Sequence, residues 1–367
     1  MSASAEVLLL GFGEPDAPDL PATVDFLQRI FANNARLESH LDEEEALARS
    51  QTLAERRAPG LLADYEKMGG SPLLGQCRER AALLENELAE RGHHCRVRVG
   101  MQFTEPFIGD VFRSAQAAAA GRIVALPLYP LCGASTTVAA LDALRQAAAE
   151  ASAAEASAAE ASAAEADADG AGPEIVEIAG WHTHPAFVKL VADGVREAAA
   201  TAGADLSGQG TLVYFSAHGT PIRYLDEGSR YDEYVTELCA AVARELGQER
   251  HAVGFQNHSN RGIPWTEPAN EELVRRVQAE RLVVVPISFL HEQSETLMEL
   301  DVDLRELVEE LGMEMVRVPA PPTDGRLAAI LADLVEPLLA ADIPAAGAGD
   351  YSPCQCRGAP GAFCLSG

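Results

Sequence analysis

Three acidic residues recur at a spacing of four in the second half of the chain. Glu295, Glu299 and Asp303 follow an apolar run at 282–287, in the stretch LVVVPISFLHEQSETLMELDVD. Residues four apart share one face of a helix, so the three carboxylates would form a column. Such a column could bind, relay or neutralise cations, or it could be the solvated face of an amphipathic helix.

A histidine supplies the second kind of group that metal or proton chemistry needs. His218 and Gly219 follow the apolar run 211–215 in the stretch TLVYFSAHGTP. Ligand sites of parallel sheets lie at the carboxyl ends of strands, so His218 and Glu295 would meet at one sheet edge. An imidazole beside a carboxylate suits Fe²⁺ or Zn²⁺ and could also accept a proton. No G-x-S-x-G motif accompanies Ser216, which argues against a hydrolase.

Composition excludes several classes of partner. The 367 residues include 28 Lys and Arg against 56 Asp and Glu, and the net charge is −28. Nucleic-acid binding requires a basic surface, so we expect no nucleic-acid partner. No apolar stretch has the length of a membrane-spanning helix, and the first residues lack the pattern of a signal peptide. We therefore expect a cytoplasmic protein with at most peripheral membrane contact, and seven cysteines that stay reduced or bind a metal.

Strands and helices are expected to alternate along the chain. Such alternation predicts an α/β fold with parallel sheets covered by helices on both faces. Four strands in each half predict two similar α/β halves, each with a four-stranded parallel sheet, that meet at a cleft. The eight expected strands lie at 6–10, 96–101, 122–128, 174–178, 211–215, 252–255, 282–287 and 314–318.

Domain boundaries follow from shifts in composition. We expect an N-terminal half over 1–180, a C-terminal half over 181–343 and a cysteine-containing tail over 344–367. The segment 15–96 is too long for one crossover helix and should hold two or three helices. The sequence E-A-S-A-A repeats between 150 and 165, and we interpret it as a helix extension leading into a mobile insertion at about 150–170.

Six motifs together resemble one known family. They are GFGEP (11–15), YEKMGGSPL (65–73), YPLCGASTT (129–137), FSAHGTP (215–221), GIPWTEP (262–268) and PISFLHEQSETLMELD (286–301). Between about residues 6 and 339 the chain resembles the ferrochelatases, and the S-A-H-x-x-P and E-T-L-x-E-L-D pieces are specific to that family. The resemblance implies a lyase that inserts Fe²⁺ into a porphyrin between two Rossmann-like domains and releases two protons, a late step of haem biosynthesis.

The resemblance also implies roles for individual residues. His218 and Glu295 match the catalytic and metal-binding positions, and His218 would accept pyrrole protons or help to bind iron. Glu299 and Asp303 match an acidic path for metal or protons. The positions that contact the porphyrin or its propionates are matched by Phe12, Ser71 and Tyr129. From the residues alone, capping of a helix is the favoured role of Ser71.

The chain departs from the family pattern at several points. Phe12 replaces a tyrosine, and Asp64 an arginine, of the coproporphyrin-type enzymes of Gram-positive bacteria. Glu292 and Gln293 replace the usual Asp-His pair. The stretch 256–265 is one residue longer than usual, so we assign no catalytic role to His258. Both protoporphyrin IX and coproporphyrin III remain open as substrates.

The tail carries a second cluster of candidate ligands. Some ferrochelatases, including members from several bacterial groups, hold a [2Fe–2S] cluster on three C-terminal cysteines and one from the first half. By this resemblance the ligands would be Cys132, Cys354, Cys356 and Cys364, although their spacings differ from the familiar ones. A Cys₄ set also suits zinc. The remaining alternative is a disordered tail with free thiols.

Two rival functions come from other classes. One is a chelatase for another tetrapyrrole, such as sirohydrochlorin, which would share the fold and a histidine-based site. The other is a non-catalytic haem or metal carrier that kept the fold. The sequence allows either a monomer or a homodimer.

Overall fold

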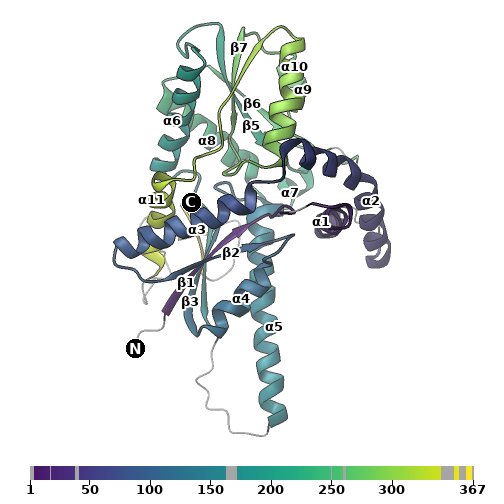
Figure 1. The fold of residues 1–367 in the computed structure, drawn as a ribbon, viewed down its shortest axis with the longest axis vertical. Helices are drawn as coiled ribbons and strands as arrows, with labels where there is room; N and C mark the ends of the chain where they lie inside the picture. The colour runs from purple at the N-terminus through teal and green to yellow at the C-terminus, as the bar shows by residue number, and fades with distance from the viewer. Residues whose placement is uncertain are drawn as a thin grey trace.

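Each of the eight apolar runs forms a parallel strand. The computed structural model describes residues 4–16, 18–37, 41–162, 172–248, 250–258, 262–339, 351–354 and 361–365 (Figure 1). The strands of the N-terminal half are β1 (Ser4–Gly11), β2 (Arg96–Met101), β3 (Ala120–Pro127) and β4 (Glu174–Gly180). Those of the C-terminal half are β5 (Thr211–His218), β6 (His251–Gln256), β7 (Arg281–Pro286) and β8 (Glu314–Arg317).

The two halves share one strand order. The first four strands are arranged β2-β1-β3-β4, and the second four β6-β5-β7-β8, so the first strand of each half lies between the second and the third. The strand order therefore reverses beside β1 and β5, and this is where parallel α/β sheets form ligand crevices. The expected pair of similar Rossmann-like halves is confirmed.

The C-terminal tail extends the N-terminal sheet. The short strand β10 (Ala362–Cys364) pairs parallel with β4, and β9 (Ser352–Pro353) pairs antiparallel with β10. The N-terminal sheet thus has six strands, two more than expected, while the C-terminal sheet has four. Because β10 occupies the edge of β4, the backbone groups of that edge are paired and the tail is part of the fold.

One hydrophobic cluster spans both halves. Its buried side chains come from one face of each sheet and from four helices, α3 (Leu73–Glu90), α6 (Pro185–Thr201), α8 (Tyr231–Leu246) and α11 (Gly325–Val335). In Figure 1, α11 lies beside α3 at the junction of the halves. Arg91 after α3 bonds to Asp333 and Glu336 at the end of α11, at 2.6 and 3.1 Å. The last helix thus ties the C-terminal half to the N-terminal one.

The opposite faces of the sheets have their own covering helices. The N-terminal sheet packs on α4 (Ile108–Ala117) and α5 (Ala139–Ser162). The C-terminal sheet packs on α9 (Asn270–Val274), α10 (Arg305–Glu310) and the π-helix η4 (Glu295–Leu304). Apart from the helices before β2, the other described helical segments are α7 (Ile222–Asp226), η2 (Ala134–Val138) and η5 (Glu336–Leu338).

The long segment before β2 contains three α-helices, as expected. These are α1 (Leu20–Asn33), α2 (Glu43–Met68) and α3, with the short turn η1 (Ala35–Leu37) after α1. A capping box between Asp42 and Glu45 begins α2, and Gly69 ends it in the left-handed conformation with φ 77°. Phe26, Phe31 and Leu53 of α1 and α2 form a small hydrophobic cluster with Phe12 and Phe103 beside the cleft.

The insertion expected at about 150–170 lies partly in helix α5 and partly outside the described residues. The first repeats of E-A-S-A-A continue α5 as a helix to Ser162, and the rest of the predicted insertion lies outside the described residues. Among the described helices, none is both long and apolar enough to cross a membrane.

The packing of β10 predicts that the tail contributes to stability. Phe363 is 6% exposed, so Phe363→Ala should lower the free energy of unfolding by about 3–5 kcal/mol through lost burial and a cavity. The matched control is Leu47→Ala, because Leu47 is 55% exposed and its truncation should change stability by no more than about 0.5 kcal/mol. Urea denaturation measures both. Equal, small effects would show that β10 is not part of the stable core.

Candidate active site

The imidazole of His218 and the carboxylate of Glu295 meet at the reversal point of the C-terminal sheet. His218 is the last residue of β5, and Glu295 follows the neighbouring strand β7. Their nearest atoms, Nε2 and Oε1, are 3.1 Å apart. The Nδ1 atom of His218 lies 2.5 Å from the carbonyl oxygen of Gly219, to which it can only donate. Nε2 therefore faces Glu295 as the atom that takes up a proton or binds a metal.

Hydrogen bonds hold the loop between β7 and Glu295 near both of its ends. Ser288 Oγ accepts the backbone N–H of His218 at 2.7 Å, which fixes the loop to the end of β5. Glu292 pairs with Arg317 at 2.7 Å and accepts the backbone N–H of Ala320 at 2.8 Å. Glu292, which replaces an acid of the usual Asp-His pair, thus anchors the loop.

Two glutamines orient the carboxylates of the column. Gln293 donates its amide N–H to Glu295 Oε2. Gln256, at the end of β6, donates to the backbone oxygen of Glu295 at 3.0 Å and to Glu299 Oε2 at 3.1 Å. The hydroxyl of Ser216 donates to Gln256 Oε1 at 3.1 Å, so the glutamine that binds Glu299 is itself held by a buried hydrogen bond.

The column lies on a π-helix. We expected a regular α-helix after β7, but Glu295 begins the ten-residue π-helix η4. Such helices have i→i+5 hydrogen bonds and wider turns, and they occur mostly at functional sites. Glu295 and Glu299 both line the cleft, whereas Asp303 at the far end is exposed and is not among the lining residues. The structure therefore brings two of the three acids to the site.

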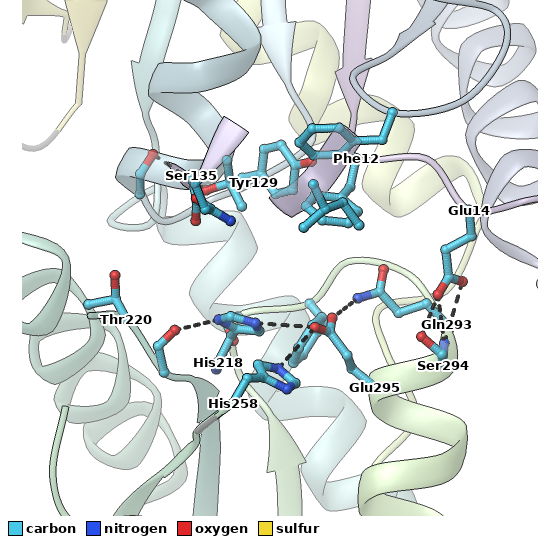
Figure 2. A pocket seen from close by; sticks show the side chains of 18 of the residues that line it. Phe12, Glu14, Tyr129, Ser135, His218, Thr220, His258, Gln293, Ser294 and Glu295 are labelled. Atoms are coloured by element: carbon cyan, nitrogen blue, oxygen red, sulfur yellow. Dashed lines mark hydrogen bonds and ion pairs between the residues drawn. The ribbon is translucent and has the colours of Figure 1, made fainter. Parts of the chain in front are cut away.

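A second imidazole stands beside the first. His258 lies two residues after β6, with its Nε2 3.4 Å from Glu295 Oε1 and its Nδ1 3.7 Å from Glu299 Oε1. The ring centroids of His258 and His218 are 5.1 Å apart. Figure 2 shows both rings facing Glu295 from the floor of the cleft. The sequence analysis assigned no catalytic role to His258, whereas the structure places it beside Glu295. The available signal was a histidine just past the end of a third strand of the same sheet.

These groups shift one another's proton affinities in opposite directions. Burial raises the pKa of Glu295, but His218 and His258 outweigh burial, and the pKa is lowered. Burial keeps the pKa of Glu299 raised although His258 opposes it. For His258, burial lowers the pKa, but Glu299 and Glu295 outweigh it and raise the pKa to about 9. Glu295 thus holds a negative charge at the centre, and Glu299 behind it binds protons more readily.

The N-terminal half forms the opposite wall of the cleft. Figure 2 shows Phe12, Tyr129 and Ser135 across from His218 and Glu295. Phe12 stacks edge-on against Phe103, with ring centroids 4.7 Å apart, and Tyr129 donates to Gln102 at 3.2 Å. Most of the wall near α1 and α2 is apolar, with Phe26, Leu27, Ile30, Phe31 and Leu61 lining the cleft. A flat, mainly apolar ligand would fit between such surfaces.

A buried carboxyl group, Glu14, joins the two walls. Its oxygens accept hydrogen bonds from the hydroxyls of Ser71, Ser294 and Tyr65. Burial raises the pKa of Glu14, although Ser294 and Ser71 oppose the shift. Ser71 itself is not among the residues that line the cleft, and its Oγ also accepts the backbone N–H of Leu73 at 3.2 Å. Ser71 therefore lies just before α3 and holds Glu14, a residue to which the sequence analysis assigns no role.

The candidate cluster cysteines that the structure describes do not line the cleft. Cys132, Cys354 and Cys364 are all buried, in the hydrophobic cluster that spans both halves. Cys364 pairs with Gly180 at the end of β4, and the next residue, Trp181, donates its backbone N–H to Pro130 at 3.0 Å, which brings the segment of Cys132 close. The hydroxyl of Tyr351 is buried there without a hydrogen bond. Cys356 lies outside the described residues.

The chain is similar to known proteins over most of its length. The family model described as Ferrochelatase matches residues 5–339. The chain belongs to the ferrochelatase family. It is 30% identical to a ferrochelatase of Aquifex aeolicus over 335 residues, covering 90% of this chain and 98% of that protein. It is 31% identical to a ferrochelatase of Synechococcus sp. (strain JA-3-3Ab) over 341 residues, covering 91% and 88%.

A solved structure shares the fold of this chain. SirB from Bacillus subtilis with Fe³⁺ superposes with a TM-score of 0.50 at 11% identity, covering 90% of this chain and 95% of that one. At that identity the likeness concerns the fold alone. The match to the ferrochelatase family model ends at residue 339, so the tail cysteines lie beyond the matched part of the chain.

The pKa of His258 predicts a pH dependence of stability in the metal-free protein. The folded pKa of about 9 exceeds the ordinary value of 6.5, so protonated His258 stabilises the fold below about pH 6.5. That contribution is lost as the pH rises from 6.5 through 9. Over this pH range, the thermal unfolding midpoint of the original protein should fall relative to the midpoint of His258→Gln. A constant difference between the two midpoints would contradict the raised pKa.

Proposed function

We propose that this chain inserts Fe²⁺ into a porphyrin and releases two protons. The observation that carries the proposal is the contact of 3.1 Å between His218 Nε2 and Glu295 Oε1 on the floor of an apolar cleft. Membership of the ferrochelatase family supports the same reaction. Insertion needs a site that binds iron, a base for the pyrrole protons and a surface that holds the flat ring.

Each wall of the cleft has its part in the reaction. The aromatic and aliphatic side chains around Phe12 hold the macrocycle over the floor and exclude water. Ionised Glu295 attracts and binds the iron ion, which exchanges its water ligands for the ring nitrogens. Two pyrrole N–H protons must leave as the iron–nitrogen bonds form, which conserves charge because Fe²⁺ replaces two protons.

The acidic column gives the protons a way out. His218 Nε2 accepts a pyrrole proton, since its Nδ1 is bound to the carbonyl of Gly219. Glu299 holds a proton more readily than Glu295 because burial raises its pKa, so protons move outward from the ring. Exposed Asp303 at the far end of η4 passes them to solvent.

The lining of the cleft favours protoporphyrin IX over coproporphyrin III. Among the described residues that line it, Arg57 is the one Lys or Arg, while Glu14, Glu295 and Glu299 are acidic. Coproporphyrin has four propionates and protoporphyrin two, and each propionate near an acidic surface needs a cation. Phe12 at the position of the coproporphyrin-type tyrosine supports the same choice. The arrangement favours an enzyme over a carrier, because a carrier needs no base beside the metal.

Insertion joins iron to the ring without oxidation or hydrolysis, which is lyase chemistry. We propose a cytoplasmic enzyme acting as a monomer or homodimer. Reduced thiols of the buried Cys77 and Cys239 suit that compartment.

An anaerobic assay with Fe²⁺ tests the reaction and its substrate. The original protein should metallate protoporphyrin IX faster than coproporphyrin III, followed by absorption or loss of porphyrin fluorescence. Glu295→Gln should reduce insertion by at least about 100-fold, because it removes the charged ligand. Asp303→Asn should slow insertion and leave porphyrin binding unchanged.

The matched control is Glu309→Gln, a carboxylate on the exposed side of α10, which should keep full activity. Metallation of neither porphyrin by the original protein would overturn the proposed function. Equal activity of Glu295→Gln and the original protein would show that the column is only a solvated face. Faster metallation of coproporphyrin III would refute the substrate choice while retaining the reaction.

We also propose that the tail holds a [2Fe–2S] cluster on Cys132, Cys354, Cys356 and Cys364. Cys132, Cys354 and Cys364 are buried, Cys364 pairs with Gly180 at the end of β4, and four thiolates are the usual ligands of such a cluster. The buried hydroxyl of Tyr351 has no hydrogen bond and could donate one to a cluster sulfur. When bound, the cluster supplies a one-electron redox centre and links the tail to the N-terminal sheet.

Visible absorption of anaerobically purified protein tests the cluster. The original protein should be coloured and contain equal amounts of tail iron and acid-labile sulfide, and Cys364→Ser should lose both. Cys95→Ser is the control, because Cys95 is only partly buried and lies outside the proposed set. A colourless protein containing zinc would indicate the Cys₄ zinc site. A colourless protein without metal would reject both.

A further inference from the structure

His258 completes a set of three metal-binding donors with His218 and Glu295. One ligand atom from each of the three residues can be chosen so that all lie within 4.8 Å of one another. Each residue comes from a different segment: the end of β5, the residues after β6 and the start of η4. Figure 2 shows the three side chains converging on one point of the cleft floor.

The spacing of the donors matches the coordination shell of one ion. Two ligands that each lie about 2.1 Å from a metal, at tetrahedral or octahedral angles, are about 3.0–3.4 Å apart. The distances from Glu295 Oε1 to His218 Nε2 and to His258 Nε2 are 3.1 and 3.4 Å. An ion placed against the carboxylate can therefore reach both imidazoles.

The hydrogen bonding of His258 is incomplete without an ion. Its Nε2 is buried and makes no hydrogen bond, because the contact with Glu295 lacks hydrogen-bond geometry. Buried polar atoms in proteins are nearly always satisfied, and an exception is expected where a ligand binds. On the other side of the ring, Nδ1 faces Glu299 at 3.7 Å. A carboxylate behind the second nitrogen is the usual way in which proteins orient a metal-binding histidine.

We propose that His258 is a third ligand to the iron ion before insertion. Two histidines and one carboxylate on one side of the ion form the set that many non-haem Fe²⁺ proteins use, and its remaining positions stay open. Those positions face the cleft, where the ring nitrogens would replace water. This inference rests on the proposed function for the identity of the metal, but metal binding can be measured without any porphyrin.

Binding of Co²⁺ alone to the full chain tests the inference. Co²⁺ accepts nitrogen and carboxylate ligands, and its visible absorption reports the donors around it. His258→Ala should weaken Co²⁺ binding by about 10–100-fold, as expected when a metal site loses one of its supporting groups. His258→Cys should restore tight binding and increase the sulfur-to-cobalt absorption above that of the original protein. His218→Ala should weaken binding as well.

The matched control is His94→Gln. His94 is exposed and lies between α3 and β2, at the opposite end of the sheet from the ligand-binding edge, so binding should be unchanged. Thermal unfolding of each variant identifies any that fails to fold, and His258→Cys then carries the comparison. In the insertion assay, His258→Ala should raise the KM for Fe²⁺ and leave the KM for porphyrin unchanged.

Several outcomes would overturn the inference. The first is that the original protein shows no saturable Co²⁺ binding. The second is that the Co²⁺ affinity of His258→Ala lies within twofold of that of the original protein. The third is that His258→Cys binds Co²⁺ tightly without added sulfur-to-cobalt absorption. None of these depends on porphyrin turnover. If the original protein binds Co²⁺ through His258 but metallates no porphyrin, the ligand assignment stands and the proposed function fails.

Discussion

The pairing of an imidazole with a carboxylate across two adjacent strand ends determines the arrangement of the rest of the site. His218 and Glu295 can meet only because β5 and β7 are parallel neighbours in register, with Phe215 opposite Val285. Gly219 and Gln293 bind the two side chains, and Ser288 binds the backbone N–H of His218. Burial raises the pKa of Glu295, but His218 and His258 outweigh it and lower the pKa. The cost of desolvating an ionised carboxylate is met because two imidazoles face it.

Rigid placement of the two walls is the second requirement. The hydrophobic cluster that includes α3 and α11 is continuous across the junction, and Arg80 of α3 donates to the carbonyl oxygens of Leu290 and Pro321 in the other half. At the cleft, Glu14 accepts hydrogen bonds from one hydroxyl of each half, those of Ser71 and Ser294. The distance between the walls is therefore defined by packing on one side and by a buried carboxyl group on the other. The net charge of −28 draws cations toward this opening.

The sequence was sufficient for the parts of the site that local patterns specify. The apolar runs located all eight parallel strands, and strand ends then brought His218 and Glu295 together. The π-helix was not predictable, because its hydrogen-bond pattern depends on how η4 packs and not on the spacing of its acids. Likewise, the position of His258 depends on how the residues after β6 fold back. The pairing of β10 with β4 joins segments nearly two hundred residues apart, and no short motif encodes such a contact.

The position of β10 also has a consequence for the order in which the chain becomes complete. The N-terminal half leaves the ribosome before the C-terminal half, yet the edge of its sheet is covered by residues synthesised after both. Until β10 has been synthesised, the free edge of β4 is exposed and can pair with other strands. Helix α11 likewise reaches α3 only once the last helix of the C-terminal half has been synthesised. The first half to emerge is therefore finished only after the second half has been made.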